Sequence, residues 1–365
     1  MKFIDEYRNA DDSKRIVDKI KNILRHNWYI MEICGGQTHT ILKYRLEEIL
    51  PEKITLLHGP GCPVCVTSVE FIDKAIQLSF HKDVILTSYG DMLRVPGTKY
   101  SLLYSKSIGA NVKTIYSPID ALKLAKDYPD KKIIFFAIGF ETTAPATASS
   151  IIQARKMGLK NFFVLCAHVL VPPAIEILLK SQLTKIDGII AAGHVCTVMG
   201  FKEYIPIAKK YKVPIVVTGF EPNDLLLGIF MTVKQLEEGR YDVENQYKRA
   251  VREEGNMSAK KIMFDVFEVV DRKWRGIGFI NNSGLKIKKE FEDMDAEKVF
   301  SLNTQIDEID TECIAGLILQ GIKKPVDCLN FARKCTPENP LGAPMVSSEG
   351  SCNAYYKFGS VKINN

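Results

Sequence analysis

The feature that most constrains the fold is a series of eight short apolar runs separated by segments with helical spacing of apolar residues. Runs that are apolar throughout are typical of strands buried on both faces of a parallel sheet. Parallel strands need crossover connections, and the helical segments between the runs can supply them. The chain is therefore predicted to be α/β and built from βα units. The expected strands are 29–34, 54–57, 84–87, 112–116, 132–138, 162–166, 188–192 and 215–218.

The polar stretch 126–132 predicts a boundary between two α/β domains. After Glu238 the alternation of runs and helical segments stops, and residues 241–254 are expected to form a charged helix. The predicted domains are 29–127, 128–238, and a smaller third one made of 239–365 with the helical segment 1–28. In the second domain, helices are expected to begin near Thr142, Pro172, Val198 and Pro222.

Composition narrows the class of protein. Of 365 residues, 46% are hydrophobic and 25% charged, which is ordinary for a globular chain. The net charge of +6 comes from dispersed Lys and Arg rather than a basic tract interleaved with aromatics, so nucleic acid is not an expected partner. No apolar run reaches the roughly 18 residues of a membrane span, and the first residues lack a signal-peptide core. We expect a cytoplasmic protein whose nine cysteines are ligands, redox thiols and core residues.

Two cysteines lie on a glycine-built turn between an expected strand and a helical pattern. Residues 58–65 read His-Gly-Pro-Gly-Cys-Pro-Val-Cys, which places Cys62 and Cys65 at a helix start. A helix N-terminus favours thiolates. The spacing suits either one metal ion or one disulfide.

Cys34 also follows an expected strand and precedes two glycines, so it is predicted to be a strand-end thiol. If Cys34, Cys62 and Cys65 converge, they give three soft thiolates suited to iron or zinc with an open position. His39, about one helical turn beyond Cys34, is a candidate for orienting a ligand or moving a proton. The alternative for His39 is an ordinary hydrogen-bonded histidine near a helix start, and His58 has the same two interpretations.

A second sulfur group closes the chain on sequence rich in Gly, Pro and Asn. Its intervals are longer than the paired Cys-x-x-Cys arms of a zinc knuckle. The four thiolates of a [4Fe-4S] cluster can come from separate loops, so that cluster is the predicted occupant. The expected ligands are Cys313, Cys328, Cys335 and Cys352.

Two similar segments, Gly-Phe-Glu-Thr-Thr at 139–143 and Gly-Phe-Glu-Pro at 219–222, follow expected strands. Helix capping and first-turn charge are sufficient to explain Glu141 and Glu221. The functional alternative places both carboxylates in one cleft at the carboxyl ends of the strands, where open α/β sheets bind ligands.

The sequence resembles the hydrogenase maturation HypD family through six blocks that run in order through nearly the whole chain. The cysteine positions of these blocks show no departure from the family pattern. The blocks are Cys34–His39, Gly59–Cys65, Gly139–Pro145, Gly193–Cys196, Thr218–Pro222 and Asn339–Cys352.

The resemblance implies two Rossmann-like α/β domains facing a cleft and a third domain with a [4Fe-4S] cluster. It also implies a HypC-type chaperone and a HypE-type cyanide donor as partners, with a transient iron ion that becomes Fe(CN)2CO. By motif, Cys34, Cys62 and Cys65 are the iron-site cysteines, while His39, Glu141 and Glu221 line the cleft. The implied role is a redox-active assembly scaffold rather than a conventional turnover enzyme.

Two other functions are consistent with the residues alone. The cysteines suit an iron-sulfur-linked thiol-disulfide reductase that acts on a protein substrate. They also suit a zinc-stabilised interaction scaffold without redox chemistry.

Overall fold

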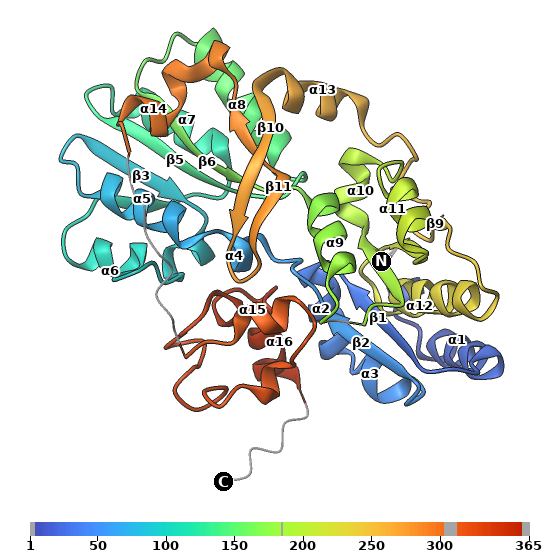
Figure 1. Ribbon diagram of the computed structural model, residues 1–365. Helices are drawn as coiled ribbons and strands as arrows, with labels where there is room; N and C mark the ends of the chain where they lie inside the picture. Colours follow the sequence, from blue (N-terminus) through green and yellow to red (C-terminus); the bar gives the residue numbers. More distant parts are fainter. Residues whose placement is uncertain (1–3, 184, 303–311, 360–365) are drawn as a thin grey trace.

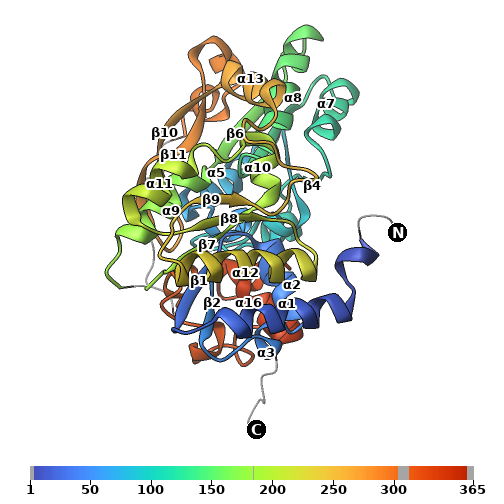
Figure 2. The same cartoon turned by 90° about the vertical axis from the view of Figure 1, so that its right-hand side faces the viewer.

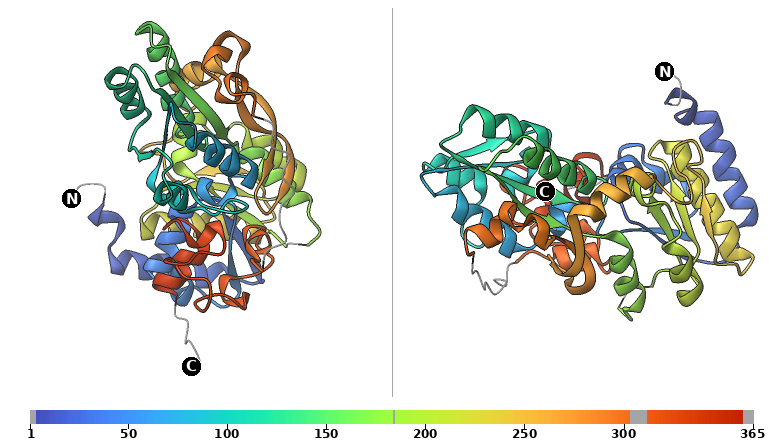
Figure 3. Two further views of the ribbon diagram at one scale, coloured as in Figure 1. Left: turned by 90° about the vertical axis from the view of Figure 1, so that its left-hand side faces the viewer. Right: turned by 90° about the horizontal axis from the view of Figure 1, so that it is seen from above.

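The computed structural model describes residues 4–183, 185–302 and 312–359. Two lobes, each built around a parallel sheet, lie side by side, and a small cysteine-rich unit packs below them (Figure 1). Figure 3 shows the two lobes from above. None of the helices in these three segments is both long and apolar enough to cross a membrane.

The first lobe contains a five-stranded sheet with the order β2-β1-β7-β8-β9, in which every neighbouring pair is parallel. Its helix α1 packs along α12 on one face of the sheet (Figure 2). The strands are β1 (Trp28–Glu32), β2 (Ile54–His58), β7 (Gly188–Ala192), β8 (Ile215–Thr218) and β9 (Val243–Asn245). The helices are α1 (Ala10–Ile23), α2 (Gly35–Lys43), α3 (Leu46–Ile49), α10 (Gly193–Met199), α11 (Tyr204–Tyr211) and α12 (Pro222–Glu237).

The second lobe contains a four-stranded parallel sheet with the order β4-β3-β5-β6. An antiparallel hairpin, β10–β11, packs against β6 and α9. The strands are β3 (Val84–Ser88), β4 (Val112–Thr114), β5 (Lys132–Gly139), β6 (Phe162–His168), β10 (Phe267–Trp274) and β11 (Gly278–Ile287). The helices include α4 (Pro63–Val66), α5 (Val69–Ser79), α6 (Leu102–Ser107), α7 (Pro118–Asp127), α8 (Ala144–Lys156), α9 (Val171–Lys180), α13 (Met257–Val266) and α14 (Ala296–Val299).

The α/β prediction with parallel sheets is confirmed, and each of the eight apolar runs is a strand whose ends lie within two residues of the expected ones. Helices α8, α9 and α12 begin within two residues of the predicted starts. The start expected near Val198 is wrong, because that region holds two helices, α10 and α11. The charged helix expected at 241–254 is also wrong, since this segment forms β9 and turns.

The grouping of strands differs from the sequential division at 128. Strands β1 and β2 pair with β7 to β9, and β3 and β4 pair with β5 and β6, so the chain crosses from one lobe to the other after β2 and returns after β6. Likewise, α1 and β9 belong to the first lobe rather than to a C-terminal domain. The physical reason is that an all-apolar run fits any position in a buried parallel sheet, and the run itself carries no information about its partner.

Residues 312–359, here called the cysteine unit, have their own small hydrophobic cluster and pack against α2 through Leu42. Most of the unit is irregular. Its short elements are α15 (Ala315–Leu319), η4 (Pro325–Asp327), η5 (Ala343–Met345) and α16 (Ser351–Phe358). That it carries an iron-sulfur cluster remains a prediction.

Candidate thiol site and cysteine cavity

Cys34 lies just after β1 and is the N-cap residue of α2. Its thiol is buried, with 2% of the residue exposed. The backbone N–H of Cys34 donates to Oε2 of the buried Glu32 at 2.9 Å, and the Thr38 hydroxyl donates to the same carboxyl group. The Glu32 carboxyl therefore fixes the conformation of the Cys34 loop.

Cys62 and Cys65 are joined as a disulfide on the turn after β2. Cys62 is the N-cap residue of α4, and its Sγ accepts the N–H of Cys65 at 3.2 Å. The expected pair is thus in its oxidised form, and the alternative of a metal held by both thiolates does not apply to this form.

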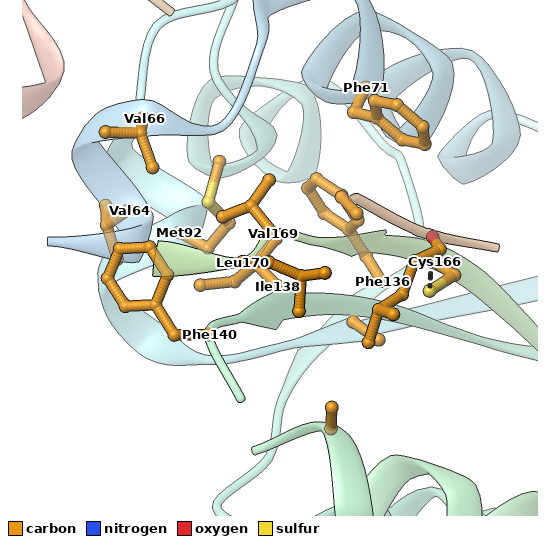
Figure 4. Packing of buried hydrophobic residues seen from close by; sticks show 14 of the residues in the cluster. Val64, Val66, Phe71, Met92, Phe136, Ile138, Phe140, Cys166, Val169 and Leu170 are labelled. Carbon is orange, nitrogen blue, oxygen red and sulfur yellow. Dashed lines mark hydrogen bonds between the residues drawn. The ribbon is translucent and has the colours of Figure 1, made fainter. Parts of the chain in front are cut away.

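The disulfide turn lies at the junction of the two lobes. Val66 accepts a hydrogen bond from the N–H of Arg275, in the turn after β10, at 2.8 Å. Val64 and Val66 also belong to the hydrophobic cluster that includes Phe136 and Ile138 of β5 (Figure 4). The turn is therefore attached to the second lobe, although its strand β2 belongs to the first.

The disulfide turn and the Cys34 loop are in direct backbone contact. The N–H of Gly35 donates to the carbonyl oxygen of Gly61 at 3.0 Å. A Cβ atom on Gly61 would lie closer than 3.0 Å to the backbone N and Cα of Cys34, so only glycine allows this approach. The two thiol segments therefore meet, through their backbones, at the ends of the neighbouring strands β1 and β2.

The side chain of His194, near the start of α10, lies beside the Cys34 thiol. Its Nδ1 lies 3.6 Å from the Cys34 Sγ, and its ring packs against Phe220 with centroids 5.1 Å apart. Burial lowers the pKa of His194 to about 4, and burial, with the nearby charge of Glu349, raises the pKa of the Cys34 thiol far above its usual range. A neutral imidazole beside a protonated thiol is in position to accept the proton that a soft metal would displace.

His39 faces the cysteine unit. Its Nδ1 lies 3.3 Å from the carbonyl oxygen of Ser348, and its ring makes an edge-to-face contact with Phe358 at 5.0 Å. The described contacts of His39 therefore connect α2 to the cysteine unit, and a role for His39 at an iron atom remains a prediction.

The two expected cleft carboxylates have different surroundings. Glu141 is buried beside the N-terminus of α9, where its Oε1 accepts the N–H of Val171 at 2.9 Å. Glu221 is the N-cap residue of α12 and forms an ion pair with Arg8, with a second hydrogen bond of 2.9 Å. The cavity that Glu141 lines has no described contribution from Glu221. Both residues therefore cap helices, and their part in any reaction stays a prediction.

The four late cysteines line one small cavity whose other described walls are apolar or glycine. The pKa of Cys352 is raised by burial first and then by the charges of Cys313, Cys335 and Cys328, so these three sulfurs lie near enough to act on it. A Cβ atom on Gly342 would overlap the Sγ of Cys313, so this glycine makes room for a thiolate. The cavity is lined by Cys313, Cys328, Cys335, Cys352, Ile314, Ala315, Ile318, Phe331, Gly342, Pro344 and Met345.

Four cysteine thiols from separate segments around one apolar cavity are the donor set that an iron-sulfur cluster uses, and that such a cluster binds here remains a prediction. Within the three described segments, no group of three or more Cys, His, Asp or Glu side chains is arranged to hold one metal ion. A single ion draws its sulfur ligands to about 2.3 Å, whereas a cluster distributes its thiolates over separate irons. Thiolates held in an apolar cavity also favour a group that carries positive charge.

A buried hydrogen-bonded chain links the thiol site to the cysteine unit. His58 at the end of β2 places its Nδ1 2.7 Å from Glu32 and its Nε2 3.2 Å from the hydroxyl of Tyr355. Tyr355 lies on α16, three residues after Cys352, and its hydroxyl donates to Glu47 at 3.3 Å. The carboxyl group that orients Cys34 is therefore tied to the helix that carries one of the four cysteines.

Sequence reasoning did not assign Glu32, Tyr355 or a contact between His194 and Cys34. His194 is 160 residues from Cys34, and Tyr355 is 297 residues from His58. In the sequence, His58 and His194 each lie just after an expected strand, which indicates that they lie at a sheet edge. That position does not identify the residue that each histidine contacts.

Fold and site together define a class of protein: a two-lobed parallel α/β thiol protein with an appended four-cysteine unit. A family model described as "Hydrogenase formation hypA family", named HypD, matches residues 11–359. The chain belongs to this HypD family, as the sequence blocks indicated.

Relatives named hydrogenase maturation factor HypD are similar over almost their whole length. The protein of Azotobacter vinelandii is 45% identical over 98% of this chain and 97% of its own. Those of Cupriavidus necator and Escherichia coli K12 are 43% and 42% identical, covering 99% and 98% of this chain and 98% of each relative.

Proposed function

We propose that this protein matures [NiFe] hydrogenase as a redox-active scaffold on which, with a HypC-type chaperone, the Fe(CN)2CO group is assembled. Family membership supports hydrogenase maturation. The observation that supports the finer proposal is the backbone contact between the Cys34 loop and the Cys62–Cys65 turn, because it brings the segment that carries the Cys34 thiol beside a disulfide that can act as a two-electron couple.

In this proposal the iron ion is the substrate, and Cys34 supplies a thiolate to it with His194 accepting the proton. A second thiolate comes from the HypC-type partner. Because Cys34 is buried, its loop shields an iron ion bound to it from water, and the thiolate itself is a soft ligand. We also propose that His39, Glu141 and Glu221 line the cleft between the two lobes, as the family resemblance implies.

The Cys62–Cys65 pair supplies the electrons for cyanide transfer. A HypE-type donor delivers cyanide as a thiocyanate, and cleavage of its S–C bond takes two electrons and one proton to give a thiol and cyanide. Oxidation of the dithiol to the disulfide releases two electrons and two protons, so the step balances with one proton released. The disulfide must then be reduced before the next transfer.

The cysteine unit is proposed to hold a [4Fe-4S] cluster through Cys313, Cys328, Cys335 and Cys352. When bound, this group supplies one-electron transfer. The chain's own contribution is to hold the four thiolates in an apolar cavity and to connect α16 to the Cys34 loop through Tyr355 and His58.

The alternative is an iron-sulfur-linked thiol-disulfide reductase that acts on a protein substrate. The oxidised Cys62–Cys65 pair fits this function as well, because such an enzyme also needs a disulfide that can be reduced. The two functions differ in iron content, since only the scaffold binds an iron beyond the cluster.

The experiment is anaerobic iron and acid-labile sulfide analysis with Mössbauer and infrared spectra, on the protein alone and copurified with its HypC-type partner. We expect one cluster in both samples and an extra iron with cyanide and carbonyl bands only in the complex. Cys62→Ala should keep the cluster spectrum and lose the cyanide bands. The matched control is Cys166→Ala, because Cys166 is a buried core thiol that donates to the carbonyl oxygen of Leu285. Cluster iron alone in the complex would favour the reductase.

A further inference from the structure

A cavity of about 400 Å³ lies outside the thiol site, between the N-terminus of α9, the α10–α11 region and the β10–β11 hairpin. Its volume falls within the range of small-molecule sites. The residues described as lining it include no cysteine. Most of the wall is apolar and includes Leu170, Pro172, Met199, Phe264 and Val269.

Glu141 is the most buried polar residue in the described lining of this cavity, with 1% of the residue exposed. Its Oε1 is satisfied by the N–H of Val171, but its Oε2 is buried without a hydrogen-bond partner among the residues that the structure describes. A buried carboxyl oxygen without a hydrogen-bond partner is destabilising, so a ligand that pairs with it gains affinity.

The charged residues around the cavity indicate whether that ligand is positively or negatively charged. A second carboxyl group in the lining is that of Glu203, the N-cap residue of α11. The one cation in the described wall, Lys210, is already paired with Glu176 at 3.0 Å. Two carboxyl groups, those of Glu141 and Glu203, in an otherwise mostly apolar wall favour a ligand with a positively charged group attached to an apolar chain.

We propose that this cavity binds an organic cation, an alkylammonium or alkylguanidinium group, whose charged head pairs with Glu141 and Glu203. The cation can come from a free small molecule or from a Lys or Arg side chain of a protein partner. Glu141 is also one of the residues proposed to line the cleft, but cation binding at this cavity is measured without iron, cluster or partner and does not depend on cofactor assembly.

Binding should displace a proton from Glu141. Burial raises the pKa of Glu141 to about 8, so the group is mostly protonated at pH 7 and must ionise to pair with a cation. The cation therefore releases close to one proton at pH 7 and almost none at pH 9. The titratable groups that interact directly with Glu141 are Glu203, Tyr204 and Cys196. Lys260 acts on Glu203, and the Glu176–Lys210 ion pair lines the same cavity.

The test is isothermal titration of the full-length protein with n-butylguanidinium, repeated in buffers of different ionisation enthalpy. Its neutral isostere n-butylurea is the matched ligand control. We expect n-butylguanidinium to bind at least tenfold more tightly than n-butylurea and to release a proton at pH 7. Equal affinity for the two probes, or binding of neither, would overturn the proposal.

Variants locate the binding. Glu141→Gln keeps the acceptor for Val171 and should weaken n-butylguanidinium binding at least tenfold with no proton release. Val269→Trp, at an exposed wall position, should weaken it by filling the cavity. The control Glu268→Gln removes the same charge on β10 outside the described lining and should change affinity less than twofold. Unchanged binding in both cavity variants refutes the site.

A second titration distinguishes the sources of the cation. The probe is the blocked peptide acetyl-Gly-Arg-Gly-amide. Binding comparable to n-butylguanidinium supports a protein side chain as the occupant, and binding of n-butylguanidinium alone supports a free small molecule.

Discussion

Replacing Gly61 by alanine tests whether the contact between the two thiol segments is essential. The added Cβ would lie closer than 3.0 Å to the N and Cα atoms of Cys34, which belong to backbone and cannot rotate away. Ordinary contact starts near 3.4 Å, so the loops must separate by a distance on the order of 1 Å. The substitution also strains the Gly35 N–H bond to the Gly61 carbonyl oxygen.

The expected cost follows from these two effects. Forcing extra atoms into a packed site costs about 1 to 3 kcal/mol, and loss of one hydrogen bond adds about 1 kcal/mol. The apparent free energy of unfolding should therefore fall by about 2 to 4 kcal/mol in urea titrations. In Gly90→Ala, the matched control, the new Cβ meets only the Thr114 Cγ2 at 3.5 Å, and the change should stay within about 0.5 kcal/mol.

A second assay measures the accessibility of the Cys34 thiol directly. Cys34 is 2% exposed, so iodoacetamide should label it slowly in the native protein and at least tenfold faster in Gly61→Ala. The reasoning is refuted if Gly61→Ala matches Gly90→Ala in both stability and labelling of Cys34, because the two loops would then not depend on close contact.

Three further changes have defined outcomes. The pKa of Glu141 is about 8 in the folded protein and near 4.5 when unfolded, so the folded state holds the extra proton and stability falls as pH rises between those values, by at most roughly 5 kcal/mol. Glu141→Gln should therefore gain stability relative to wild type between pH 5 and pH 8.5 in urea titrations, and a pH-independent difference would contradict this. Arg249→Ala leaves the fully buried Asp224 without its guanidinium partner at 2.8 Å and should cost about 3 kcal/mol, whereas a loss below 1 kcal/mol would show that the carboxyl group finds another donor. Gly342→Ala crowds the Sγ of Cys313 and should at least halve the acid-labile sulfide bound per chain while far-UV circular dichroism stays unchanged; full sulfide content would argue against the proposed ligand set.

The local elements were predictable because their signals lie in consecutive residues. All-apolar runs identified the eight strands, and the glycines around Cys34 and Cys62 identified strand-end turns. The charged stretch 241–254 was misread as a helix because polar spacing alone does not distinguish a solvated helix from a short edge strand with turns.

Sequence alone determined the α/β class, the thiol segments and the set of four late cysteines. Tertiary structure decided which strands share a sheet, that His194 rather than His39 lies beside Cys34, and that Tyr355 links the cysteine unit to Glu32 through His58. The physical reason is distance along the chain: helix and strand periods arise from neighbouring residues, whereas sheet pairing and side-chain contacts between remote residues depend on how whole elements pack.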